Sequence, residues 1–212
     1  MRRTGVPKAK KPRIPSLVKA AEAYKANLLN RNVLLVGIDR DGNVGVQQFR
    51  FLARHFRHLT GVRTTQNIKA VDFFNRCVEH RIADSDIRED PSGFAELKLQ
   101  ASKAMFKPDL SATYFGDANG SRLYVQADKY AGNNWACLGF VEDSGWHDPM
   151  TMLDSPVEKE ISQARKFRVV AVFAKAVTES RYGAPIKVAL RERDSWDKIR
   201  SMLPAGFSYL SL

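Results

Sequence analysis

The most constraining feature of this sequence is a change of pattern at about residue 111. Before that point, apolar residues recur at helical spacing in the segments 16–30, 67–82 and 90–106. After it, short β-branched or aromatic runs are separated by Gly, Asn and Asp, a pattern typical of strands joined by turns. Helices followed by strands favour an α+β fold, with N-terminal helices packed on a mainly antiparallel β-sheet.

Each helical segment has an expected buried face. Ser16 and Asn67 are the predicted N-caps of the first two helices. The predicted faces are Leu17, Ala21, Tyr24 and Leu28; Ile68, Val71, Phe74 and Val78; and Phe94, Leu97, Ala101 and Met105 or Phe106.

The expected strands begin with a hairpin. Two β-rich runs in segment 32–51 flank Asp41-Gly42, a dipeptide that favours tight hairpin turns. Further strands are expected within 112–116, 122–128, 135–142, 167–177 and 186–192, and a terminal helical turn within 195–204.

Positive charge is concentrated at the N-terminus. The chain has 34 Lys and Arg against 23 Asp and Glu, a net charge of +11, which favours polyanionic partners. The first thirteen residues contain six basic and no acidic residues, together with Pro7 and Pro12. Residues 1–15 are predicted to be a flexible basic arm, and 16–212 a single α+β domain. The arm is expected to bind phosphates without sequence preference, or to be a plain solvated tail; its candidate binding residues are Arg2, Arg3, Lys10 and Lys11.

Nothing in the sequence resembles a membrane span or a secretory signal, because the longest apolar run, 33–38, has the length of a strand. Cys77 and Cys137 are too few for a disulfide framework, although one bond between them stays open. A cytoplasmic location is expected.

Several catalytic classes lack their motifs. The sequence contains no G-x-S-x-G and no phosphate-binding glycine loop. The pairs His55/His58 and Cys77/His80 have spacings that occur in zinc sites, but such pairs are common by chance. We therefore expect no metal site and no cofactor, with Cys77 in the core and His55 on the surface.

The remaining inventory of His, Lys, Arg, Thr and Tyr is sufficient for cleavage of RNA without a metal. The 2′-hydroxyl of RNA supplies the nucleophile, so the protein needs a base, an acid and cations near the phosphate. Many RNA-binding proteins have the same inventory and no activity, so composition leaves catalysis open.

A set of ordered motifs adds a specific resemblance. The segments FRHLTGV at 56–62, AVDFFNRCVEHRIADSDI at 70–87 and LKL at 97–99 are followed by Gly139-Phe140, a Pro-x-Thr-x-Leu turn at 149–153, Lys175 and Tyr182. Together they resemble a phage and mobile-element family of the Barnase–EndoU–colicin–RelE-like (BECR) nuclease group. The resemblance covers about residues 50–185 and implies a BECR-like fold and a nuclease activity.

The resemblance also implies site residues. His58 would be a general base or acid, Lys98 or Lys175 would stabilise the phosphorane, and Thr60 or Thr151 would bind a phosphate oxygen. Tyr182 would stack on a base, while Arg54, Arg57 and Arg63 would make the rim basic. Structural roles compete with these assignments: a hydrogen-bonded His58, a solvated Lys98, or a Thr151 that caps a turn.

Three functions follow. The first is a metal-independent ribonuclease of a phage or mobile element, such as a toxin or effector, which would make the chain an endoribonuclease. The second is a non-catalytic nucleic-acid-binding protein of a mobile element. The third is an inhibitor or adaptor that binds a host protein or an antitoxin through Trp135 and Trp146, although core positions are expected for these tryptophans. RNA is the expected partner, and no membrane partner is expected.

Overall fold

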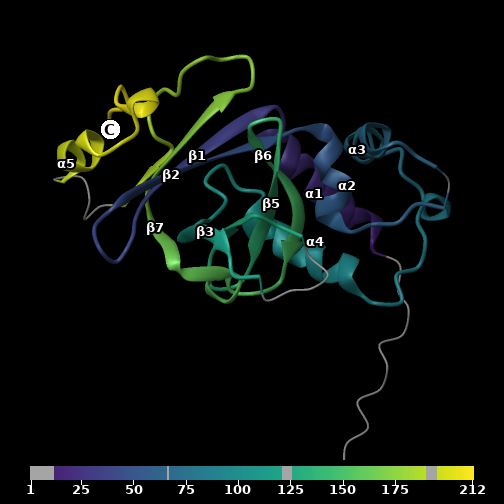
Figure 1. Cartoon of the computed structure of the whole chain (residues 1–212). Helices are drawn as coiled ribbons and strands as arrows, with labels where there is room; N and C mark the ends of the chain where they lie inside the picture. The colour runs from purple at the N-terminus through teal and green to yellow at the C-terminus, as the bar shows by residue number, and fades with distance from the viewer. Residues whose placement is uncertain (1–11, 66, 121–125, 190–194) are drawn as a thin grey trace, which may run out of the picture.

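The structure is a computed structural model that describes residues 12–65, 67–120, 126–189 and 195–212. It confirms the α+β fold: N-terminal helices pack on a mostly antiparallel sheet. In Figure 1, helices α1 to α4 lie toward one end of the sheet, and the C-terminal helix α5 lies at the other end. No helix among the described residues is long and apolar enough to cross a membrane.

The sheet closes on itself. The described strands pair in the order β1-β2-β6-β5-β4-β3-β7-β8, and β1 also pairs with β7. All pairs are antiparallel except β2 and β6, which meet in one parallel pairing, Phe49 with His147. The strands are β1 Arg31–Ile38, β2 Val44–Phe51, β3 Tyr114–Ala118, β4 Lys129–Gly132, β5 Cys137–Asp143, β6 Trp146–Leu153, β7 Ile161–Ala176 and β8 Lys187–Val188.

The predicted hairpin is confirmed as β1 and β2, with Ile38 opposite Val44 and Gly42 at a φ of +85° in the turn. The prediction of a turn at 149–153 was wrong. Thr151 lies inside β6 and not in a turn, because segment 146–153 pairs with β5 over its whole length. Residues 122–125 of the predicted run 122–128 lie outside the described residues, and β4 begins at Lys129.

The helices begin at other residues than the predicted caps. Arg13 precedes α1, and Ser16 lies within its first turn, where Pro15 is also tolerated because the first turn needs no amide donor. Helix α3 follows Lys69, not Asn67. The helices are α1 Ile14–Asn27, α2 Phe56–Thr60, α3 Ala70–Val78, α4 Phe94–Met105 and α5 Trp196–Ser201, with 3₁₀ turns η1 Ala53–His55, η2 Asp84–Asp86, η3 Val157–Lys159 and η5 Ala205–Phe207.

The end of the segment that was predicted to be a basic arm lies within the structure, since Pro12 is buried and α1 begins at Ile14. Residues 12–15 therefore belong to the fold. Arg2, Arg3, Lys10 and Lys11 lie outside the described residues.

An aromatic cluster joins the helices to the sheet. The Tyr24 ring in α1 lies 5.6 Å from Phe56, 5.7 Å from Phe74 and 5.1 Å from Phe106, measured between ring centroids. Its hydroxyl donates to the carbonyl of Leu52 at 2.9 Å, directly before η1. This cluster fixes α2, which begins at Phe56, against the other N-terminal helices.

Of the predicted helix faces, that of α1 is confirmed, because all four residues are fully buried. The other two are wrong in part: Val71, Phe94 and Leu97 are exposed. The buried stripe of α3 consists of Phe73, Phe74 and Cys77, and that of α4 includes Ala95, Leu99 and Met105; each is rotated by about one residue from the predicted stripe.

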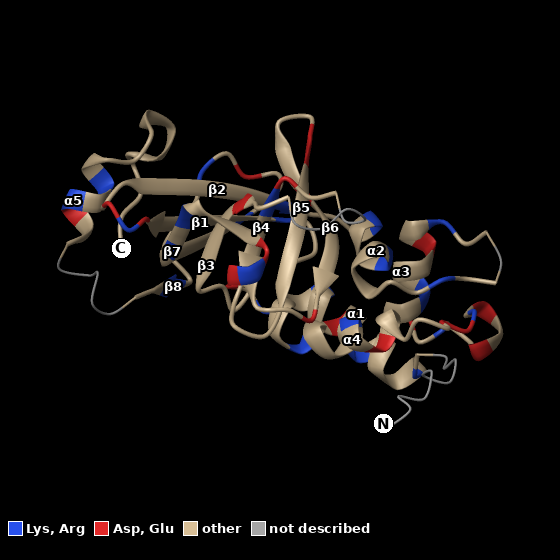
Figure 2. Ribbon diagram, turned by 60° about the horizontal axis from the view of Figure 1, so that its bottom comes forward, with Lys and Arg blue, Asp and Glu red and all other residues tan. Residues whose placement is uncertain are grey.

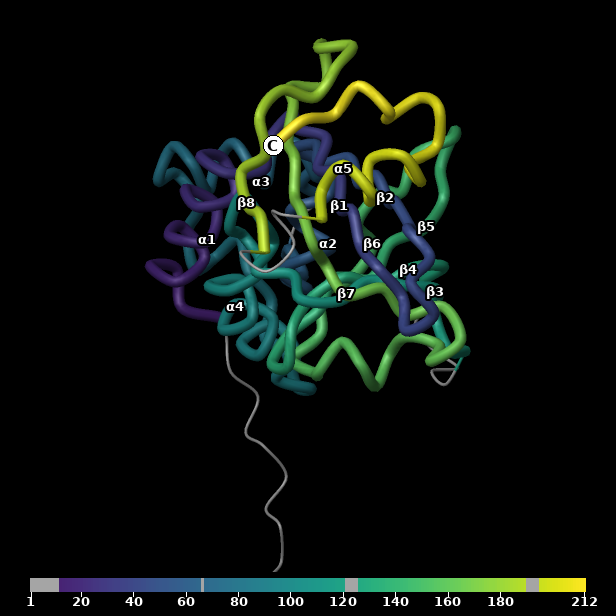
Figure 3. The backbone as a smooth tube through the Cα atoms, turned by 90° about the vertical axis from the view of Figure 1, so that its left-hand side faces the viewer, coloured from purple at the N-terminus to yellow at the C-terminus, as the bar shows by residue number. Residues whose placement is uncertain are grey.

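A second core lies on the opposite face of the sheet. There the C-terminal segment packs Trp196, Ile199 and Leu203 against Leu34 and Phe173. Figure 3, in which this end faces the viewer, shows the segment lying across β1, β2 and β7.

Removing the Phe56 side chain tests the aromatic cluster. Phe56 is fully buried, so Phe56→Ala leaves a cavity and is expected to lower the free energy of unfolding by about 4 kcal/mol in urea denaturation. Trp135 is 80% exposed, so Trp135→Ala is the matched control, with an expected change within about 0.5 kcal/mol. Equal losses in the two variants would contradict this role of Phe56.

Candidate active site

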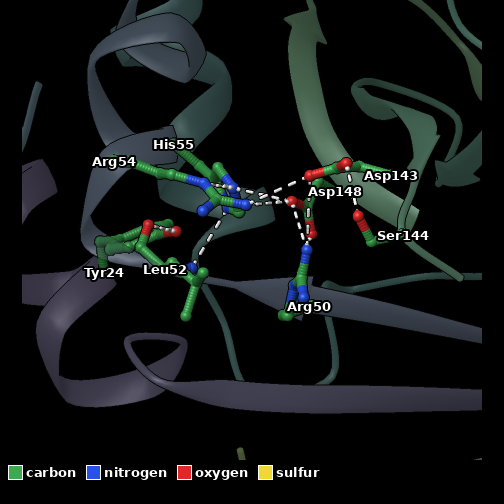
Figure 4. A network of polar contacts seen from close by, with 8 residues as sticks. All are labelled: Tyr24, Arg50, Leu52, Arg54, His55, Asp143, Ser144 and Asp148. Carbon is green, nitrogen blue, oxygen red and sulfur yellow. Dashed lines mark hydrogen bonds and ion pairs between the residues drawn. The ribbon is translucent and has the colours of Figure 1, made fainter. Parts of the chain in front are cut away.

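A buried carboxylate joins β6 to the segment that precedes α2. Asp148 accepts hydrogen bonds from Arg50 Nε and Nη2, both at 2.8 Å, and from Arg54 Nη2 at 2.7 Å. Asp143 lies farther out, 3.4 Å from Arg54. Figure 4 shows these groups converging on Asp148 from β2, η1 and β6, with His55 beside them. Burial opposes ionisation of Asp148, but the two arginines outweigh it, and the pKa of Asp148 lies below its ordinary value.

His55 completes this Asp148 cluster, defined as Arg50, Arg54, His55, Asp143 and Asp148. The prediction that His55 lies on the surface is wrong, since only 6% of it is exposed. The amide of Leu52 donates to Nδ1 at 3.2 Å, and Nε2 lies 3.1 Å from Arg54 Nε and 3.3 Å from Asp148 Oδ2. Burial lowers the pKa of His55 to about 4; Asp148 opposes this, and the two arginines add to it.

Helix α2 ends where Lys98 of α4 passes close to the backbone. Gly61 terminates α2 with a φ of +66°, which favours glycine. A Cβ atom at this position would lie 2.9 Å from Lys98 Cδ. The Lys98 ammonium donates to the carbonyl of His58 at 3.2 Å and to Thr151 Oγ1 at 3.3 Å. Lys98 thus links α4 to both α2 and β6.

A hollow of about 410 Å³ opens at this junction, and we call it the cationic hollow. None of its described lining residues carries a carboxylate. In Figure 2, blue segments that mark Lys and Arg lie on α2 and in the chain around it. The lining residues are Arg57, His58, Gly61, Val62, Arg63, Thr64, Lys98 and Met150.

The electrostatics of the hollow favour neutral His58. Partial burial lowers the pKa of His58 below its ordinary value of 6.5, and the positive charges of Arg57 and Lys98 lower it further. Burial also lowers the pKa of Lys98, although Asp90 opposes this. At neutral pH the hollow therefore offers an imidazole that can accept a proton beside fixed positive charges.

A second hollow of about 280 Å³ adjoins the first, and we call it the aromatic hollow. It shares Gly61, Arg63 and Lys98 with the cationic hollow, and it adds a carboxylate and apolar side chains. Its lining residues are Gly61, Arg63, Asp90, Ser92, Phe94, Lys98, Thr151 and Leu153.

The structure therefore brings together His58, Lys98, Thr151, Arg57 and Arg63. Thr60 does not reach this group. It is fully buried, and its hydroxyl donates to the carbonyl of Arg57 at 3.0 Å, so it cannot contact a phosphate. Arg54 pairs with Asp148 and lines neither hollow.

Lys175 and Tyr182 lie elsewhere. The Lys175 ammonium lies 4.9 Å from the centre of the Tyr182 ring and donates to the carbonyl of Ser180 at 2.9 Å. Both line a separate cleft that includes Gln48 and the segment 205–209, which we call the C-terminal cleft. Only 5% of Tyr182 is exposed, and its hydroxyl donates to Gln48 Oε1 at 2.9 Å, so its ring is held within the fold.

The residues of the two zinc-like pairs are dispersed. His55 contacts Asp148, Cys77 is buried in the core, and His80 contacts Glu22 at the surface. Burial raises the pKa of Cys77 to about 12, which suits a core residue. The described part of the chain contains no cluster of three or more His, Cys, Asp or Glu that could hold a metal ion.

Sequence reasoning missed Asp148, Asp90 and Phe94. Asp148 and Asp90 carry no distinguishing local pattern. Phe94 was assigned to a buried face because the helical stripe was placed one residue away from the true one. The buried state of His55 could have been suspected only from its neighbours Phe56 and Leu52.

The Asp148 cluster is expected to contribute strongly to stability. Asp148→Asn leaves Arg50 and Arg54 facing a neutral group in a mostly buried place, so the free energy of unfolding should fall by about 3 kcal/mol. Asp143→Asn is the control: its side chain is 54% exposed, and the loss should be at most about 1 kcal/mol. Urea denaturation at pH 7.5 measures both, and equal small losses would contradict the structural role of Asp148.

Stability should also depend on the protonation of His55. Its pKa is about 4 in the fold and about 6.5 when unfolded, so between these pH values the unfolded chain binds more protons. Above pH 6.5 the titration of His55 does not lower the free energy of unfolding. As the pH falls from 6.5 toward 4 the titration lowers it progressively, and the loss is about 2 kcal/mol at pH 5. In His55→Gln the decrease in unfolding free energy from pH 7.5 to pH 5 should be smaller by that amount, because other titrating groups are common to both proteins. Identical decreases would show that His55 does not titrate in this way.

Comparison with known proteins identifies the family of the chain. The family model described as phage-Barnase-EndoU-ColicinE5/D-RelE like nuclease 4 matches residues 16–184, which include most of α1 and every residue of the two hollows. The match begins well before residue 50, where the resemblance noted from the motifs starts. No curated protein and no solved structure matches the chain. Since the match covers most of its length, the chain belongs to the phage Barnase–EndoU–colicin E5/D–RelE-like nuclease family 4.

Proposed function

We propose that this protein is a metal-independent endoribonuclease whose reaction centre is the cationic hollow. One observation carries the proposal: His58, Lys98, Arg57 and Arg63 line a single open hollow, and none of its described lining residues is acidic. Such a surface attracts a phosphodiester and places a titratable base beside it. Membership in a nuclease family supports a nucleic acid as the substrate.

In the proposed reaction, His58 takes the proton of the RNA 2′-hydroxyl. Its lowered pKa keeps the ring neutral, and therefore able to accept that proton, at neutral pH. The 2′ oxygen attacks the adjacent phosphorus, and the departing 5′ oxygen is protonated by solvent in the open hollow. The products are a 2′,3′-cyclic phosphate and a free 5′-hydroxyl.

Lys98 stabilises the developing charge. Within the described residues its ammonium makes two hydrogen bonds, to His58 and Thr151, so its third N–H can donate to a phosphate oxygen. Thr151 accepts from Lys98, which leaves its hydroxyl hydrogen free to donate to the same ligand. Arg57 and Arg63 add positive charge at the rim.

Thr60 and Lys175 have no catalytic role in the proposed reaction. Thr60 is buried, and Lys175 lines the C-terminal cleft. There are two alternatives: the exposed Trp135 binds a protein, or the cationic hollow binds nucleic acid without cleaving it. The following experiment separates them. A role as a toxin or effector, with an antitoxin or host protein as partner, would follow from cleavage of cellular RNA.

The direct test is incubation of the purified protein with total RNA in EDTA. Wild type should produce fragments that end in cyclic phosphate, and His58→Ala should cleave at least about a hundredfold more slowly. His80→Ala is the matched control, because His80 is an exposed histidine that pairs with Glu22 and does not line the hollow. It should cleave like wild type.

The pH dependence gives a second readout in the same experiment. With His58 as base, kcat/KM should rise with pH through a pKa below 6.5, and the His58→Ala variant should lack this limb. RNA that stays intact but is bound equally by wild type and His58→Ala would support the non-catalytic binding function. Intact, unbound RNA would favour a protein partner.

A further inference from the structure

We propose that the aromatic hollow is a nucleobase subsite in which a base stacks on Phe94, next to its phosphate in the cationic hollow. This inference rests on the proposed function and deepens it, because it names the part of the RNA that the second hollow recognises. Of the residues that line this hollow, Asp90, Phe94 and Leu153 have no part in the proposed reaction.

The first observation is the position of Phe94. Its side chain is 63% exposed although it is a large apolar ring at the first residue of α4. The ring lines the aromatic hollow and does not join the buried stripe of the helix. An exposed aromatic ring beside a cationic surface is the arrangement that proteins use to stack bases of single-stranded nucleic acid.

The second observation is the difference between the two hollows. The cationic hollow has no acid among its described lining residues, whereas the aromatic hollow contains Asp90, Phe94 and Leu153. A nucleotide has the same division: an anionic phosphate and a flat, largely apolar base. The anionic part is repelled by Asp90, so it is directed to the cationic hollow and the base to the aromatic one.

The third observation is the contact between the hollows. They share Gly61, Arg63 and Lys98. Lys98 donates to His58 on the cationic side and to Thr151 on the aromatic side. A single nucleotide can therefore place its phosphate in the cationic hollow and its base in the aromatic hollow.

Asp90 holds the start of α4 and thereby the position of Phe94. Its carboxylate accepts from the amide of Ala95 at 2.8 Å and from that of Ser92 at 3.1 Å. These bonds hold the turn that precedes Phe94 and fix the ring at the edge of the hollow. An apolar protein partner could also cover Phe94, but the adjoining surface is cationic, which favours a nucleotide.

The test measures binding by NMR titration with nucleoside 3′-monophosphates, with inorganic phosphate as the ligand that lacks a base. Phe94→Ala should weaken nucleotide binding on the order of tenfold and leave phosphate binding unchanged. Phe94→Trp should retain binding, and its emission should be quenched by the nucleotides but not by phosphate. Leu97→Ala and Trp135→Ala remove exposed apolar side chains outside the hollow and should bind like wild type.

The outcomes separate the two proposals. If Lys98→Met loses both ligands while Phe94→Ala binds nucleotides like wild type, the phosphate site stands and the nucleobase subsite is wrong. An equal loss of nucleotide and phosphate in Phe94→Ala would also overturn the subsite, since the ring would then act on the phosphate site. If wild type binds neither ligand more tightly than Lys98→Met does, the proposed function fails, and this inference fails with it.

Discussion

The ion pair between Asp148 and the two arginines is the interaction on which the site depends. It joins β6 to the end of β2 and to η1, the turn that leads directly into α2. Both Asp148 and His55 are buried, so the contact is strong only while every partner is present. Because His58 lies one turn after His55, the position of the proposed base relative to β6 is set by this cluster.

A second link, formed by Lys98, positions the site from the side of α4. Lys98 reaches from α4 to α2 and β6, and Gly61 leaves the space through which its side chain passes. Partial burial lowers the pKa of both Lys98 and His58 and so disfavours their charged forms. The same burial strengthens the attraction of the remaining charges for an anion. A basic surface formed only by exposed side chains would lack both properties.

Local sequence patterns predicted the fold class, the first hairpin and the buried face of α1. These features depend on the spacing of apolar residues along the chain and on the turn at Asp41-Gly42. They misplaced the faces of α3 and α4, because a shift of one residue changes which side chain is buried, as it does for Phe94. The motif resemblance pointed to His58 and Lys98, which the structure brings together. It could not indicate that Lys175 lies in another cleft, because that depends on how β7 pairs.

The most direct test of the central claim is to determine where on the protein a nucleotide binds. A dinucleotide without the 2′-hydroxyl cannot be cleaved, so it can be titrated into protein labelled at histidine, lysine and tyrosine and followed by NMR. The account predicts that the signals of His58 and Lys98 shift together with one dissociation constant, and that those of Lys175 and Tyr182 stay unchanged. Shifts confined to Lys175 and Tyr182 would place the ligand in the C-terminal cleft and contradict the account.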